Sequence, residues 1–172
     1  MNDTVLYARY NLESNRAVYK ILSGLSAEER NRDRGSFYGS LCGLFRHVMG
    51  GTYFFLEMFR DAVAGNAAAL KALGAMPQVP ETDPDEAGWA ELGRTLERLD
   101  GAYVALAESL GEAGLKLPVK LDWYGGKPDS VPVSFMLSQL LVHNTHHRGQ
   151  ISQILDTLKI EHDFSGIGIL PE

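Results

Sequence analysis

Apolar residues recur at helical spacing along most of the chain, and this periodicity constrains the fold more than any other feature. Residues three or four positions apart share one face of a helix, because an α-helix turns by about 100° per residue. Asp83 is a suitable N-cap for a helix over residues 83–110. Pro84 would lie in its first turn, and Glu86 stands where a capping box has its acidic residue. Its apolar stripe would comprise Trp89, Leu92, Leu96, Leu99, Tyr103, Leu106 and Leu110.

Three other segments show the same periodicity. We expect helices over residues 4–25, over residues 36–63, and over residues 130–158. The apolar stripe of the second of these helices would begin at Phe37, and Ser130 would cap the last one.

Two segments interrupt the long helices. Residues 67–73 should form a short extra helical turn, and the prolines of residues 77–84 make that stretch a linker. Residues 115–131 alternate between apolar and polar types, which indicates a short hairpin or an extended crossover. The pattern predicts an all-α four-helix bundle with a long crossover and a short extended excursion before the last helix, in one domain over residues 1–172.

The charge of the chain argues against nucleic acid as a partner. The formal net charge is -6, whereas a nucleic-acid binder needs a basic face to neutralise phosphates. The densest basic stretch is Arg30, Arg32 and Arg34, and acidic residues interleave with it. We interpret this stretch as a solvated turn between helices.

The N-terminus and the cysteine count indicate a cytoplasmic protein. A single cysteine, Cys42, cannot form an internal disulfide, which suits a reducing compartment. The first residues lack the basic start and the apolar run of a signal peptide, and no apolar stretch approaches the roughly 20 residues that span a bilayer. We therefore expect no membrane association.

Three of the five histidines cluster on the last predicted helix. Helical geometry places His143 and His147 inside its apolar stripe, about 60° and 20° from the centre, and His146 about 120° away, near the edge. Two inward imidazoles one turn apart are the arrangement with which a helix grips a zinc ion. A pair of hydrogen-bonded core histidines, or a partly exposed helix edge, would give the same pattern.

A third ligand would have to come from another helix. His47 lies about 60° from the centre of the stripe on the second long helix, where it could lean toward a neighbour. Cys42 lies about 140° from His47 and is interpreted as a buried or boundary thiol. His162, in the C-terminal tail, has no evident connection to the site. Aromatic residues that could line a pocket, but that are also typical of a core, are Tyr38, Tyr53, Trp123 and Tyr124.

Two motifs resemble the DinB family of metal-binding four-helix bundles. One is the run of residues 34–47 that ends at His47, and the other is the HxxxHRGQ run of residues 143–150. The resemblance extends to the order and separation of helices, and it implies that His47, His143 and His147 are the metal ligands. The family often has an Asp followed by a Trp shortly after the first histidine, whereas residues 51–55 here are Gly-Thr-Tyr-Phe-Phe.

Three neutral imidazoles would leave an ion with an open position, as in catalytic sites. Zinc or nickel is the leading expectation, and manganese or iron would also suit these ligands. The resemblance implies activation of a low-molecular-weight thiol for transfer to an electrophilic small molecule. The alternatives are a metal-dependent hydrolase and a non-catalytic metal- or ligand-binding stress-response protein. By analogy we expect a homodimer.

The remaining motif residues receive no catalytic role. His146 matches the motif but should face away from the site, and Arg148 and Gln150 could contact the ligands or the helix end.

Overall fold

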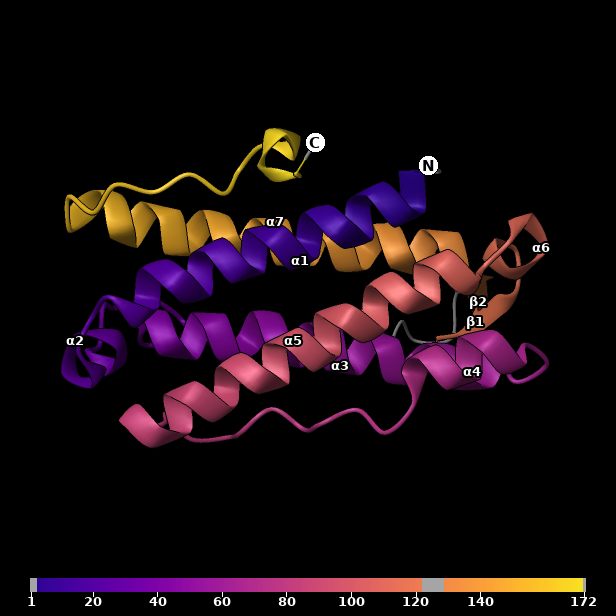
Figure 1. Cartoon of the computed structure of the whole chain (residues 1–172), viewed down its shortest axis with the longest axis horizontal. Helices are drawn as coiled ribbons and strands as arrows, with labels where there is room; N and C mark the ends of the chain where they lie inside the picture. Colours follow the sequence, from indigo (N-terminus) through magenta and orange to yellow (C-terminus); the bar gives the residue numbers. More distant parts are fainter. Residues whose placement is uncertain (1–2, 122–128, 172) are drawn as a thin grey trace.

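The computed structural model describes residues 3–121 and 129–171. Its main elements are four long helices packed side by side (Figure 1), which confirms the all-α bundle. They are α1 (Asp3–Ser23), α3 (Leu41–Ala62), α5 (Glu86–Ser109) and α7 (Val133–Thr157). The most extensive helix contacts are those of α3 with α7 and of α1 with α5.

Short elements connect the long helices. They are α2 (Ala27–Asn31), α4 (Ala67–Leu73), α6 (Glu112–Leu115), the strands β1 (Pro118–Lys120) and β2 (Ser130–Pro132), and the 3-10 helix η1 (Ile167–Ile169). The two strands pair antiparallel with Val119 opposite Val131, which confirms the expected hairpin before the last helix. The crossover between α4 and α5 runs back along the bundle (Figure 1).

Helix α3 begins five residues later than the sequence predicted. The Ser40 side chain caps it by accepting a hydrogen bond from the backbone N–H of Gly43 at 2.9 Å. Residues 36–39 form a tight turn instead, closed by a bridge between Ser36 and Gly39, with Gly39 at a φ of 73°. The prediction that Phe37 belongs to the core stripe was wrong, because this turn leaves its side chain 94% exposed.

The two helix caps that the sequence predicted, Asp83 and Ser130, were also wrong. Asp85, not Asp83, caps α5 by accepting the backbone N–H of Gly88 at 2.8 Å, while Asp83 pairs with the Arg46 guanidinium. Ser130 lies in β2 rather than at the start of α7, because pairing with β1 keeps its backbone extended. A local cap signal identifies a helix end only to within a few residues when several candidate side chains are adjacent.

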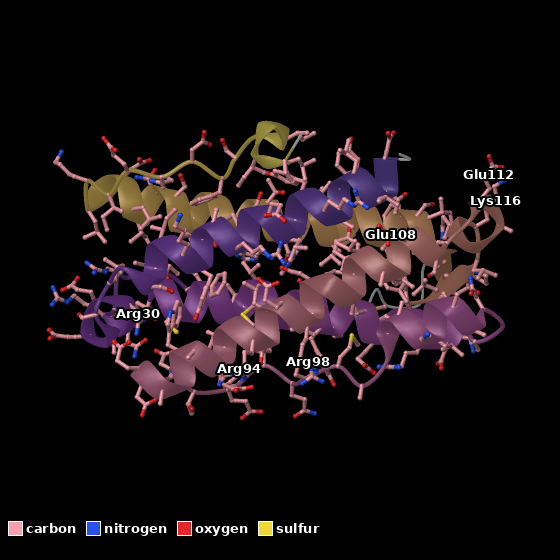
Figure 2. All side chains as sticks on the ribbon, viewed as in Figure 1. Arg30, Arg94, Arg98, Glu108, Glu112 and Lys116 are labelled. Atoms are coloured by element: carbon pink, nitrogen blue, oxygen red, sulfur yellow. The ribbon has the colours of Figure 1, made fainter. Side chains whose placement is uncertain are left out.

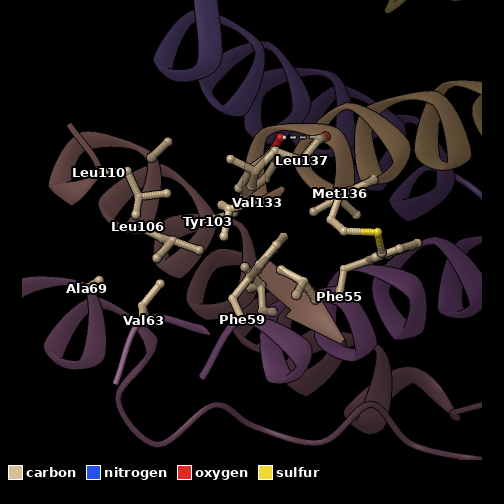
Figure 3. Packing of buried hydrophobic residues seen from close by; sticks show 14 of the residues in the cluster. Phe55, Phe59, Val63, Ala69, Tyr103, Leu106, Leu110, Val133, Met136 and Leu137 are labelled. Atoms are coloured by element: carbon tan, nitrogen blue, oxygen red, sulfur yellow. Dashed lines mark hydrogen bonds between the residues drawn. The ribbon is translucent and has the colours of Figure 1, made fainter. Parts of the chain in front are cut away.

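The apolar core has two halves along the bundle. One half gathers residues such as Phe55, Phe59, Tyr103 and Met136, drawn in Figure 3. The other half comprises Val18, Leu22, Leu41, Cys42, Leu44, Phe45, Met49, Trp89, Leu92, Leu96, Leu99, Ile151, Leu155 and Phe164. The C-terminal tail folds back over the bundle, because Phe164 belongs to this half of the core and the carbonyl of Ser165 accepts a hydrogen bond from the Tyr10 hydroxyl at 3.0 Å.

The stretch predicted to be a solvated turn forms α2 and buries one of its arginines. Arg30 is 1% exposed, whereas Arg32 remains at the surface. The Arg30 guanidinium donates to the carbonyls of Leu22 and Leu25 at the end of α1 and lies 4.4 Å from the centre of the Trp89 ring. Figure 2 shows Arg30 at the end of the bundle that carries α2. It ties α1, α2 and α5 together, since helix-end carbonyls need such donors.

No helix in the part of the chain that the structure describes combines the length and the apolar character needed to cross a membrane.

We predict that Arg30→Ala lowers the free energy of unfolding by roughly 2–4 kcal/mol, because it removes the guanidinium donor to the Leu25 carbonyl, breaks the ion pair with Glu86 and opens a void beside Trp89. Arg32→Ala is the matched control: its partners Glu28 and Glu29 form surface ion pairs, and the change should stay within about 0.5 kcal/mol. Urea denaturation measures both. Equal effects of the two substitutions would contradict the structural role of Arg30.

Candidate metal centre

Three histidines meet between α3 and α7. His47 comes from α3, and His143 and His147 come from successive turns of α7. The Nε2 atoms of His47 and His143 are 3.1 Å apart, and one ring nitrogen of each histidine lies within 4.8 Å of those of the other two. Two nitrogens bound to one zinc ion at about 2.0–2.1 Å with tetrahedral angles lie roughly 3.3 Å apart. The arrangement is therefore close to that of a coordination sphere.

Hydrogen bonds on the far side of two rings orient the ligand nitrogens. The Nδ1 atom of His143 is 3.1 Å from Oδ1 of Asn144, and Nδ1 of His147 is 2.7 Å from Oε1 of Gln150. Both oxygens accept, so each Nδ1 carries the proton and each Nε2 keeps its lone pair. Partners of this kind fix the tautomer and the angle of metal-binding imidazoles. Of the two contacts expected for Gln150, with a candidate ligand or with the helix end, the structure shows the contact with His147.

The surroundings of His47 and His147 favour neutral imidazoles. Burial, followed by the proximity of His147 and His143, lowers the pKa of His47 to about 4. Burial also lowers the pKa of His147, although the hydrogen bond with Gln150 opposes this effect. At neutral pH several nitrogen lone pairs thus converge on one point, which is unfavourable unless a cation or a donor satisfies them. The donor set fits a divalent ion.

Tyr38 is a residue of the site that helical periodicity could not identify. Its hydroxyl lies 2.8 Å from Nε2 of His47, and its ring stacks on the His47 ring with the centroids 3.9 Å apart. It precedes α3, in the turn that was predicted to be helical. Of the other pocket aromatics proposed, Tyr53 packs against the second half of the core, and Trp123 and Tyr124 lie outside the described residues.

The other candidate ligands are not members of the three-histidine group, although the His146 ring meets the His147 ring edge to face with the centroids 4.9 Å apart. Cys42 is fully buried, as expected, and burial raises the pKa of its thiol to about 11. His146 is exposed, in agreement with the helical geometry, and His162 pairs with the Ser152 hydroxyl at 2.6 Å. In residues 3–121 and 129–171, the three histidines are the one group of at least three His, Cys, Asp or Glu side chains whose ligand atoms lie close enough together to hold one metal ion.

A cavity of about 300 Å³ opens beside the centre. Its lining residues are Tyr38, Gly43, Arg46, His47, Gly50, Val79, Pro80 and Glu81. Arg46 secures the outer wall, because its guanidinium donates to the carbonyls of Pro80 and Glu81 in the crossover. A second cavity, of about 470 Å³, includes Gln150 in its lining, together with Phe37 and His146. Small molecules can therefore approach His47 through the first cavity and Gln150, the partner of His147, through the second.

Asn144 links the centre to the interior of the bundle. Its amide nitrogen donates to Oδ1 of Asn11 and to Oγ1 of Thr52, both at 3.0 Å. Its oxygen faces His143 at 3.1 Å. The fully buried amide therefore has partners for both N–H groups and for its oxygen. Because Asn144 is held by α1 and α3, these two helices determine the position of the His143 ring.

Arg148 continues the same network and does not contact the ligand nitrogens through any hydrogen bond in the described structure. Its Nη1 donates to the side-chain oxygens of Asn11 and Asn15 at 2.8 and 2.9 Å. Both asparagines in turn donate to the Asp100 carboxylate, at 3.1 and 2.8 Å. The role of Arg148 is thus to join α7 to α1 and α5. Despite these donors, burial raises the pKa of Asp100 to about 7.

We predict a specific pH dependence of stability from Asp100. The folded pKa of about 7 exceeds the usual 3.8, so the folded state holds more protons between these values and loses stability as pH rises from about 4 to 7. Below this window the contribution is absent, and above it the loss is complete, on the order of 4 kcal/mol. In metal-free protein with chelator, urea denaturation of Asp100→Asn should lack this decline. Parallel pH profiles of the variant and wild type would contradict the assignment.

A pair of adjacent glycines tests the geometry of the centre. A Cβ on Gly51 would lie 2.7 Å from Nδ1 of His143 and closer still to Cε1, whereas a Cβ on Gly50 would meet nothing within 4 Å. Gly51→Ala should therefore displace the His143 ring and weaken zinc affinity by about tenfold or more, comparable to losing an outer partner of a ligand. Gly50→Ala should leave the affinity unchanged, because it makes the same helix substitution without the clash. Competition with a chromophoric chelator measures both, and equal affinities would refute the packing argument.

Of three comparisons with known proteins, the one with protein-family models found a match. No curated protein and no solved structure matches the chain. The family model described as "DinB family" matches residues 1–158, which include all four long helices and the three histidines. The family often has an Asp and a Trp in the stretch after the first histidine. In this chain, Gly51 there leaves room for the His143 ring, and the Thr52 hydroxyl accepts a hydrogen bond from the Asn144 amide. The chain belongs to the DinB family.

Proposed function

We propose that the protein is a divalent-metal-dependent enzyme that activates a low-molecular-weight thiol for transfer to an electrophilic small molecule. His47, His143 and His147 would hold the ion, zinc or nickel in the first instance. The observation that carries the proposal is the convergence of three imidazoles next to a solvent-connected cavity. Such a centre has room for an exchangeable ligand, unlike a structural site closed by four protein ligands.

The charge of the ligand set suits this chemistry. Neutral imidazoles leave the full charge of a divalent ion available, and such an ion, when bound, favours loss of the proton from a coordinating thiol. The residues of the chain orient the ion and hold it at the cavity. Asn144 and Gln150 fix the two rings of α7, and the crossover held by Arg46 lines the same cavity as His47.

Metal content tests the first half of the proposal. Elemental analysis of metal-replete protein should find about one ion per chain in the wild type and in His146→Ala, and a loss of most of it in His147→Ala. His146 is the matched control, because it is the adjacent histidine of the same helix with an exposed side chain. Equally low metal content in all three proteins would refute the metal centre.

Thiol consumption tests the second half. Metal-loaded wild type, mixed with a panel of low-molecular-weight thiols and a generic electrophile, should consume free thiol faster than His147→Ala does. Product analysis must find the thioether, with the thiol proton released and the leaving group displaced. Stoichiometric metal without turnover of any thiol would overturn the enzymatic proposal in favour of a binding protein. Hydrolysis of the electrophile without thiol consumption would indicate a hydrolase.

A further inference from the structure

We propose that the phenol oxygen of Tyr38 is a fourth, exchangeable ligand of the metal centre. The inference rests on the three-histidine centre described above and does not depend on the identity of the substrate. The Tyr38 oxygen would occupy, as a phenolate, a coordination position that the histidines leave. Coordination breaks the phenol O–H bond, forms an oxygen–metal bond and releases one proton to solvent.

The first argument is distance. Nε2 of His47 has the Tyr38 oxygen at 2.8 Å and Nε2 of His143 at 3.1 Å. Two atoms bound to the same ion, with bonds of about 2.0–2.1 Å and angles between right and tetrahedral, lie roughly 2.9–3.4 Å apart. The Tyr38 oxygen and the His143 nitrogen therefore lie at similar distances from the His47 nitrogen, and both distances are close to those expected between two ligands of one ion.

The second argument concerns the lone pair of His47. In the structure the Tyr38 hydroxyl is positioned to donate to Nε2 of His47. An ion bound at Nε2 takes that lone pair, so the hydroxyl loses its acceptor. Its oxygen then lies next to a divalent cation, where a negatively charged oxygen is strongly favoured. Metal binding thus converts Tyr38, the hydrogen-bond partner of His47, into a ligand.

The third argument is that the local fold holds Tyr38 in place. Its ring is stacked on His47 and meets the His147 ring edge to face, with the centroids 5.5 Å apart. Its carbonyl accepts the backbone N–H of Ser40 at 2.9 Å and packs against Gly43, where any Cβ would overlap that carbonyl. A side chain positioned by its backbone and by two of the three ligand rings has a defined distance to the centre.

The proposal also accounts for the cavity. Tyr38 and His47 line the same cavity of about 300 Å³, so a small molecule entering it would contact both residues. An incoming thiol could then replace the phenolate: the S–H bond breaks, the sulfur takes the coordination position, and the proton returns to the Tyr38 oxygen. The proton count balances without another base.

Charge-transfer absorption tests the ligand directly, without any substrate. Ferric iron bound by a phenolate gives a visible charge-transfer band, whereas imidazole ligands alone do not. Apo-protein loaded with Fe³⁺ should show this band in the wild type and in the control Tyr53→Phe, and lose it in Tyr38→Phe at equal iron content. Tyr53 is the matched control because it is a half-buried tyrosine of α3 outside the centre. Circular dichroism verifies that both variants are folded.

Zinc affinity supplies a second readout. Tyr38→Phe should weaken zinc binding by about tenfold or more, since a direct ligand contributes at least as much as an outer partner. Iron-loaded wild type without the band, or a band that persists in Tyr38→Phe, overturns the proposal while leaving the three-histidine centre intact. A wild type that takes up neither metal overturns the centre itself, and with it this inference. Failure of every thiol in the turnover assay affects neither result.

Discussion

Each of the four long helices contributes a buried polar side chain at the middle of the bundle, and these side chains bind one another. The members of this polar layer are Asn11 and Asn15 of α1, Thr52 of α3, Asp100 of α5, and Asn144 and Arg148 of α7. The layer lies between the two apolar halves of the core on all four helices. Apolar contacts tolerate small rotations of a helix, but a buried polar group without its partner costs about 1–3 kcal/mol. The layer therefore selects one register and one rotation of the four helices.

The metal centre depends on this layer through the sequence of α7. His143 directly precedes Asn144, and His147 directly precedes Arg148. The motif therefore contains a histidine pair and an Asn–Arg pair, and the two members of each pair are one helical turn apart. Because successive residues differ by about 100° around a helix, the Asn–Arg pair enters the core while the histidine pair faces α3. When the polar layer fixes the rotation of Asn144 and Arg148, it also fixes the direction of both ligands. The candidate ligands are thus oriented by groups that would not themselves contact an ion.

The parts of this structure that sequence reasoning predicted are those that depend on position within a helix. Periodicity located the long helices and separated the inward His143 and His147 from the exposed His146. It failed where the partner comes from another element. Arg30 appeared to be one of several solvated arginines, because its acceptors at the end of α1 are not adjacent in sequence. Tyr38 was assigned to a helix, whereas it lies in a turn whose position relative to His47 follows from tertiary packing.

The centre is consequently asymmetric. On its α7 side, hydrogen bonds through Asn144 and Gln150 hold two ligands, and Asn144 extends this support into the core. On its α3 side, His47 is stacked against a tyrosine from a surface turn and faces a cavity. Ligand exchange requires that some groups remain fixed while one position changes its occupant. The buried polar network holds the first kind of group, and the turn before α3 presents Tyr38, the exchangeable group that we propose. The division between buried network and surface turn would then also be the division between retention of the ion and access to it.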